Sequence, residues 1–169
     1  MNIAKTLLIA GAMLAATAAN AQQLKFAHID TQTLVSQLPE KIEAETKLQE
    51  EAKKLEDQLQ VMNSDLQKKY EEYINERETL PELIRATKEK EIQDAGQRIE
   101  SYTQMAQQSL AQKEQQLLGP IIEKVTAAID AVGQENGFIY IFDTSSQVIL
   151  YHSEQSVDAA PMVKAKLGL

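Results

Sequence analysis

KLQEEAKKLEDQLQVMNSDLQKKY, the stretch from Lys47 to Tyr70, carries apolar residues at the spacing of a coiled coil. These residues are separated by 4, 3, 4, 3 and 4 positions, which is the heptad pattern of a helical seam. No Gly or Pro occurs between residues 41 and 80, so one long helix is predicted there. The seam consists of Leu48, Ala52, Leu55, Leu59, Met62 and Leu66, and then steps to Tyr70, Tyr73, Arg77 and Leu80.

A second seam with similar spacing follows Pro81. Because Pro suits the first turn of a helix but not its interior, Pro81 indicates a new helix rather than a continuing one. We therefore expect an antiparallel helical hairpin with its tip near Leu80 and Pro81, and a parallel two-chain coiled coil through Pro81 is the alternative. Each arm of close to 40 residues would reach about 60 Å. The second seam contains Ile92, Ala95, Ile99, Tyr102, Ala106, Leu110, Leu117, Ile121, Val125, Ala128 and Val132, with a kink expected at Gly119-Pro120.

The remaining apolar residues crowd into GFIYIFDTSSQVILYH, from Gly137 to His152. Gly137 is expected to end the second helix in the left-handed conformation. Strands are predicted at residues 25–29, 138–143 and 147–151, the last two forming a β-hairpin around a turn at 144–146. A final helix is predicted within residues 153–169, with Asp158 as its cap and with Val157, Met162 and Leu167 on its apolar side.

Three short strands with apolar residues on both faces cannot cover themselves within one chain. We therefore predict an α+β fold with a small strand-built body through which several subunits assemble, and with a long antiparallel coiled-coil hairpin, or leg, in each subunit. Sequence physics alone leaves the number of subunits open. The residues expected at or beside subunit contacts are Phe26, Phe138, Tyr140, Phe142, Ile149 and Tyr151.

The first 21 residues have the features of a secretory signal peptide. Lys5 precedes a short apolar stretch, and Ala19 and Ala21 form the small-residue pattern of a cleavage site after Ala21. A retained membrane anchor is the alternative, but the apolar stretch is shorter than the roughly 20 residues needed to span a bilayer. We expect export to the periplasm and no integral membrane segment after cleavage. The predicted organisation is a signal peptide (1–21), body (22–40), leg (41–118) and body again (119–169).

Charge and composition exclude several functions. The chain has 17 basic and 25 acidic residues, and this acidity argues against nucleic acid as a partner. The sequence lacks Cys, so disulfides cannot stabilise it. Neither a P-loop nor a GxGxxG motif is present, and no cofactor is expected.

No arrangement of residues in the sequence predicts an enzyme. His28 and His152 flank strands and could approach one another, but two His residues without a third ligand make a poor zinc site. Asp30 and Asp143 could form an acid–base pair, yet each precedes Thr and a capping or turn role explains both. We predict no catalytic and no metal-binding residues.

Apolar residues also gather around Pro81 at the expected hairpin tip. Leu80 and Ile84 are expected to seal the tip between the helices. Tyr73 and Ile74 are adjacent, so one of the two should be exposed as a candidate apolar binding contact, and Leu83 is a further candidate. Arg85, Lys88 and Lys90 follow the tip directly and form a candidate basic patch.

The C-terminal block GPIIEKVTAAIDAVGQENGFIYIFDTSSQVILYHSEQSVDAAPMVKAKL resembles that of the Skp/OmpH family of periplasmic chaperones. The opening FAHIDTQTLVSQLPE resembles the family's first strand and short helix, whereas the middle matches in length and helical character. The resemblance implies a homotrimer with three helical legs around a cavity. It also implies ATP-independent holding of unfolded outer-membrane β-barrel proteins, which prevents their aggregation.

The leg departs from the family's pattern in its charge. The best-known members have strongly basic legs, whereas residues 41–118 hold 12 basic and 17 acidic residues here. This difference argues against charge-driven client binding and against lipopolysaccharide contact. A structural coiled-coil adaptor of the cell envelope that binds a folded partner remains the alternative function.

Overall fold

A computed structural model describes residues 24–169 of the chain, and the predicted cleavage site at Ala19 and Ala21 lies outside them. Two compact units divide these residues. One consists of residues 24–31 and 128–168, and the other of residues 32–127. The elements are β1 (Lys25–Ile29), α2 (Thr31–Ser36), α3 (Pro39–Glu76), α4 (Glu82–Asn136), β2 (Phe138–Asp143), β3 (Val157–Asp158) and α5 (Ala160–Leu167).

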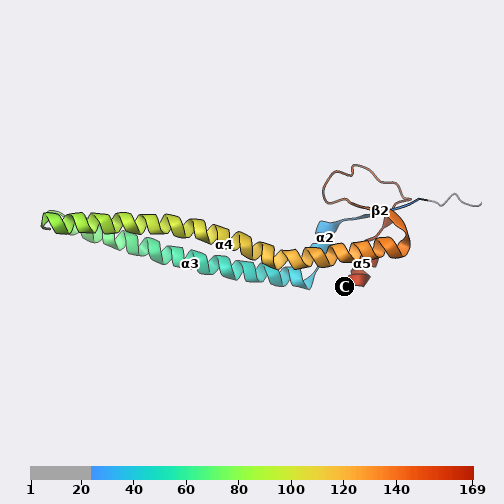
Figure 1. The fold of residues 1–169 in the computed structure, drawn as a ribbon, viewed down its shortest axis with the longest axis horizontal. Coiled ribbons are helices and arrows are strands. Elements are labelled where there is room, and N and C mark those ends of the chain that lie inside the picture. The colour runs from blue at the N-terminus through green and yellow to red at the C-terminus, as the bar shows by residue number, and fades with distance from the viewer. Residues whose placement is uncertain (1–23) are drawn as a thin grey trace, which may run out of the picture. The chain divides into compact units, whose positions relative to one another are not determined.

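The long helices α3 and α4 form the predicted antiparallel hairpin (Figure 1). Pro39 occupies the first turn of α3, where its missing N–H costs nothing, and residues 77–81 connect α3 to α4. The helix α4 continues through Pro120, so the expectation that the helix does not end there is confirmed. The predicted hairpin and its tip are confirmed as well.

The seam between the helices is only partly shielded from water. Most of its Leu residues are half-buried, whereas Tyr73, Ala95, Ile121 and Val125 are buried. The Tyr102 hydroxyl reaches across to the Leu55 carbonyl oxygen at 3.4 Å. Tyr70 and Arg77 are exposed, so their predicted place in the seam is wrong, whereas the predicted seam residue Tyr73 is buried and Leu80 is half-buried.

A three-stranded sheet has the order β2-β1-β3, and both strand pairs are parallel. Phe26 lies beside Tyr140 and His28 beside Phe142, whereas Ala27 lies beside Ile141. Parallel neighbours need a long crossover, and residues 30–137 supply it between β1 and β2. Ala27 and Ile29 point to the buried face, where Ile141 also packs near Gly133.

The predicted β-hairpin is wrong, because residues 147–151 form no strand. Asp143 turns the chain away from the sheet: its carboxylate accepts hydrogen bonds from the backbone N–H and the hydroxyl of Ser145. Gln147 then adopts a left-handed φ of 57°, which interrupts an extended path. The third strand is instead Val157–Asp158, which pairs with β1 rather than with β2.

The C-terminal helix α5 begins at Ala160, whose N–H donates to the Asp158 carboxylate at 2.9 Å. Asp158 therefore accepts a hydrogen bond from the first turn of α5, as expected of a capping residue, but the N-cap position itself is Ala159, one residue later. The prediction for the apolar side of α5 is only partly correct. Ala159 and Val163 are fully buried, whereas Val157 is exposed, because Val157 belongs to the edge strand and not to the helix.

The end of α4 follows the prediction. Gly137 has a φ of 66°, the left-handed conformation that favours Gly after a helix. This glycine lets the chain reverse directly into β2, and the Lys25 ammonium lies 3.4 Å from the Asn136 carbonyl oxygen at the same place.

Candidate functional site

One face of the sheet carries a group of aromatic rings that the chain leaves uncovered. Phe26 stacks on Tyr140 and on Phe142 at centroid distances of 6.4 Å, and Tyr140 stacks on Phe142 at 5.6 Å. The exposed fractions of Phe26, Tyr140 and Phe142 are 37%, 60% and 39%, respectively. We call these three residues the aromatic face. Exposed rings packed together on a sheet are typical of surfaces that bind a partner.

The aromatic face ends at a pair of stacked histidines. The rings of His28 and His152 lie 3.9 Å apart between centroids, and His28 Nδ1 lies 3.0 Å from the Ser156 hydroxyl oxygen. The sequence-based expectation that the two histidines could approach one another is thus confirmed. Nearly parallel rings do not converge on one ion, and residues 24–169 contain no group of three His, Cys, Asp or Glu side chains that could hold a metal.

A short polar network fixes the start of the connection from β2 to β3. Thr31 donates its hydroxyl and its backbone N–H to the Asp143 carboxylate, at 2.7 and 3.2 Å. Partial burial acts to raise the pKa of Asp143, but the hydrogen bonds from Thr31 and Ser145 outweigh it and hold that pKa below its usual value of 3.8. Asp143 therefore serves as a turn and capping residue, as the sequence suggested.

The connection itself exposes an apolar segment. Val148, Leu150 and Tyr151 are 76%, 93% and 83% exposed, whereas Ile149 is half-buried. Phe138 at the start of β2 is also half-buried. All six residues predicted at subunit contacts thus belong to one unit. Tyr140 and Tyr151 are largely exposed in the single chain, and Phe26 and Phe142 are exposed over a little more than a third of their surface.

The hairpin tip separates the adjacent residues Tyr73 and Ile74. Tyr73 is buried and donates its hydroxyl to the Glu89 carboxylate, which raises the pKa of Tyr73 above its ordinary value. Ile74 is 49% exposed and Leu83 is 77% exposed. The expectation that one of the adjacent pair is exposed is confirmed, and Ile74 and Leu83 carry the apolar surface at the tip. Ile84 is 44% exposed and does not seal the tip as expected, whereas Leu80 is half-buried.

The residues of the candidate basic patch are largely neutralised by neighbours. Arg85 pairs with Glu82 at 3.0 Å, and Lys88 pairs with Glu76 at 3.2 Å. Sequence analysis missed these pairs, although the Glu82 to Arg85 spacing of three residues is a recognisable helical signal. Among the three basic residues, Lys90 alone has no ion pair within the described part of the chain.

Comparison with known proteins bears on the whole described chain. The sequence model of one family, described as outer membrane protein (OmpH-like), matches residues 25–167. The chain belongs to the OmpH-like family. Membership of the Skp/OmpH chaperone family, expected from the C-terminal block, is thereby confirmed, and proteins of this OmpH-like family are periplasmic and generally non-enzymatic.

The fold is shared with a solved OmpH-like structure from Caulobacter crescentus CB15, a protein proposed to be an outer membrane chaperone. The two chains align with a TM-score of 0.72 over 88% of this chain and 86% of the other, at 14% sequence identity. This likeness confirms the α+β fold of the OmpH-like chain. A comparison with curated proteins found no match. Among residues 24–169, no helix combines the length and apolar character needed to cross a membrane.

Proposed function

We propose that this OmpH-like protein is an ATP-independent periplasmic holdase that binds unfolded outer-membrane β-barrel proteins and prevents their aggregation. The observation that carries the proposal is the family match, which spans residues 25–167 and so includes both the sheet and the hairpin. The relative from Caulobacter crescentus, itself proposed to be an outer membrane chaperone, supports the same function.

The working form in this proposal is a homotrimer assembled through the sheet. The aromatic face is uncovered in the single chain, and β2 is an edge strand whose outer side has no neighbour among the described residues. The exposed segment around Leu150 lies in the same unit and supplies further apolar area. Covering these groups with other copies of the chain would remove apolar surface from water and protect the strand edge.

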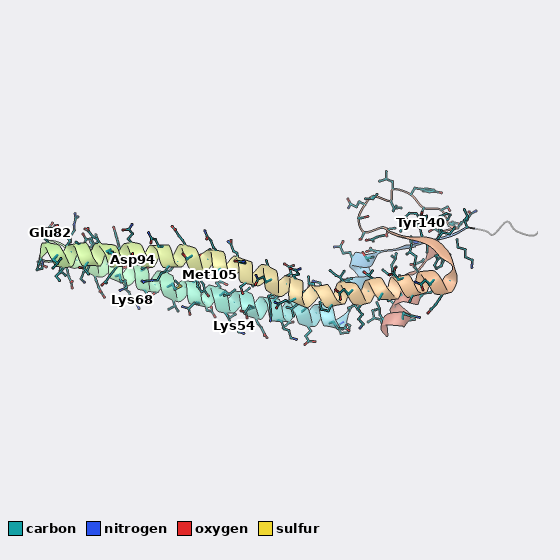
Figure 2. All side chains as sticks on the ribbon, in the orientation of Figure 1. Lys54, Lys68, Glu82, Asp94, Met105 and Tyr140 are labelled. Carbon is teal, nitrogen blue, oxygen red and sulfur yellow. The ribbon has the colours of Figure 1, made fainter. Side chains whose placement is uncertain are left out.

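Client capture in this proposal depends on apolar contact and enclosure between the legs. The hairpin exposes apolar side chains along its length, among them Ile74, Leu83 and the labelled Met105 in Figure 2. Its excess of acidic residues and the pairing of Arg85 and Lys88 leave little positive charge to attract an acidic client. Many weak apolar contacts suit a client that has no fixed structure.

The experiment is a light-scattering assay without ATP. An outer-membrane β-barrel protein denatured in urea is diluted into buffer with and without the OmpH-like protein, and we expect the protein to suppress the rise in scattering. Unchanged aggregation at excess chaperone would refute the holdase proposal. If the OmpH-like protein instead binds a folded envelope protein stably, this result would support the alternative function as a coiled-coil adaptor.

A salt titration of client binding tests the mechanism separately. Salt screens exposed charges beyond roughly 8–10 Å at physiological ionic strength, whereas apolar contact persists. Affinity for an acidic client should therefore fall only slightly between low and moderate salt. A steep fall that disappears when Arg85, Lys88 and Lys90 are replaced by Gln would show that the basic patch, and not enclosure, captures the client.

A further inference from the structure

The connection from β2 to β3 is a long loop with exposed apolar residues. Residues 144–156, called the connecting loop from here on, contain neither helix nor strand (Figure 1). Leu150 and Tyr151, near its middle, are 93% and 83% exposed. At its start, the backbone N–H of Thr144 donates to the Ile29 carbonyl oxygen at 2.9 Å, which attaches that end of the loop to β1.

The other end of the connecting loop contacts β1 through His28. The rings of His28 and His152, called the histidine pair from here on, stack at 3.9 Å with an angle of 23° between their planes. The Ser156 hydroxyl oxygen lies 3.0 Å from His28 Nδ1. His28 is half-buried on a strand that is paired on both sides, whereas His152 is exposed on the loop. If the stacked rings separate, His152 is therefore the partner that moves.

The histidine pair is stable only while its two rings do not both carry a charge. Histidine is the side chain that ordinarily gains its charge between pH 5 and 8. One proton leaves a charged ring beside a neutral one, so no two charges repel each other. A second proton places two positive rings in contact, at a separation well inside the screening length of about 8 Å at physiological ionic strength. The stack therefore tolerates the first proton and opposes the second.

The strands on both sides of His28 place one charged residue beside it. In the register of the sheet, His28 lies between Phe142 on β2 and Asp158 on β3. The Asp158 carboxylate already accepts the backbone N–H of Ala160 at 2.9 Å, at the start of α5. A single carboxylate can favour one charged ring, but it leaves the repulsion between two charged rings in place.

The other charged groups around the histidine pair lie in water or are occupied elsewhere. Glu154, two residues after His152, is exposed, and so is Asp30 just after the end of β1. Asp143 at the end of β2 accepts the hydrogen bonds of the turn described above. Lys25 lies at the opposite end of β1. Because attraction between exposed charges is weak in water, these groups offset little of the repulsion within a doubly charged pair.

We propose that the histidine pair is a pH-sensitive attachment, which holds the connecting loop against β1 at neutral pH and releases it in mild acid. The closed pair accepts its second proton less readily than the open pair does, so the open state is favoured as the pH falls. Ser156 can stay bound to His28, because a charged imidazole donates from both nitrogens and a hydroxyl accepts. Release therefore frees the part of the loop before Ser156, including the apolar residues Leu150 and Tyr151.

This inference goes beyond the holdase function and does not depend on it. Both histidines and the connecting loop belong to one unit of a single chain. The pair also borders the aromatic face, since His28 lies beside Phe142 in the sheet. Opening of the pair would thus change which apolar side chains are held in place next to the aromatic face.

The test measures the mobility of the connecting loop with a single fluorescent side chain in the full mature protein. The sequence contains no Trp, so Leu150→Trp introduces one indole, two residues from His152 and at a largely exposed position. The steady-state fluorescence anisotropy of this indole reports how freely the loop moves. We expect the anisotropy to fall between about pH 8 and about pH 5, and to recover when the pH is raised again.

Three further substitutions in the Leu150→Trp protein separate the histidine pair from other causes. His152→Phe keeps an aromatic ring that cannot gain a charge, so the anisotropy should stay high at both pH values. His28→Gln removes the strand partner, so the anisotropy should already be low at about pH 8 and change little in acid. The matched control Glu154→Gln removes a neighbouring titratable group of the loop and should leave the fall unchanged. Both histidine positions lie outside the fully buried core, so the variants should fold, and circular dichroism at both pH values checks this.

Several outcomes would overturn the proposal. A constant anisotropy from about pH 8 to about pH 5 in the Leu150→Trp protein would show that acid does not release the loop. An equal fall in His152→Phe would assign the change to another event, such as dissociation of subunits. A fall that disappears in Glu154→Gln would assign it to that carboxylate, and a high anisotropy of His28→Gln at about pH 8 would show that the histidine pair does not hold the loop.

Discussion

Replacement of Tyr140 by Ala is the sharpest test of assembly through the aromatic face. Tyr140 leaves 60% of its surface exposed in the single chain. Because an aromatic side chain presents roughly 200 Å² in all, an interface that covers Tyr140 removes about 120 Å² from water. At about 25 cal/mol per Å², this burial contributes about 3 kcal/mol per subunit.

The substitution is present in all three subunits of a trimer. The free energy of trimer assembly therefore becomes less favourable by at most about 9 kcal/mol. The concentration at which half of the trimer dissociates depends on the square root of its association constant. Even if only half of the burial energy is realised, this concentration rises about 50-fold in the Tyr140→Ala variant. Sedimentation equilibrium over a wide concentration range measures it directly.

Tyr70→Ala provides the matched control. Tyr70 is 53% exposed, close to the value for Tyr140, but it lies on α3 and not on the sheet. We expect its half-dissociation concentration to equal that of the unchanged protein. An unchanged value for Tyr140→Ala, or an equal shift for Tyr70→Ala, would refute assembly through the aromatic face.

Three further predictions concern stability. Ile29→Ala, at a fully buried core position, should lower the free energy of unfolding in urea by about 2–5 kcal/mol, whereas Leu24→Ala, at an exposed position, should change it by less than about 0.5 kcal/mol. The depressed pKa of Asp143 stabilises the fold above the unfolded pKa of roughly 3.9, and this contribution is lost as pH falls through the lower folded value. Urea unfolding between about pH 2 and 7 should therefore show a steeper acid loss in the unchanged protein than in Asp143→Asn, and parallel curves would contradict this assignment. Amide hydrogen exchange should be fast at residues 70–93 and slow in β2, because the tip has few buried side chains, and equally slow exchange in both would rule out a mobile tip.

The sequence was sufficient for features that depend on local backbone chemistry and on periodicity. Heptad spacing from Leu48 to Leu66 predicted α3, because successive residues of a helix are rotated by a fixed angle about its axis whatever packs beside the helix. Pro81 located the tip because a proline ring restricts its own φ angle. Gly137 located the end of α4 because glycine can adopt a positive φ angle. The resemblance in the C-terminal block led to the correct family.

Features that depend on which distant groups meet were decided by the tertiary structure. The apolar residues 148–151 look like a strand, but the turn at Asp143 and the left-handed Gln147 direct them away from the sheet, and Val157–Asp158 pairs with β1 in their place. Tyr70, Tyr73 and Arg77 share the helical spacing of the seam, yet only Tyr73 is buried, and Glu89 on the opposite helix accepts its hydroxyl. A strand pairing or a buried hydroxyl gains its free energy from a partner far away in the sequence, so only the folded chain determines which of two similar local patterns acquires one.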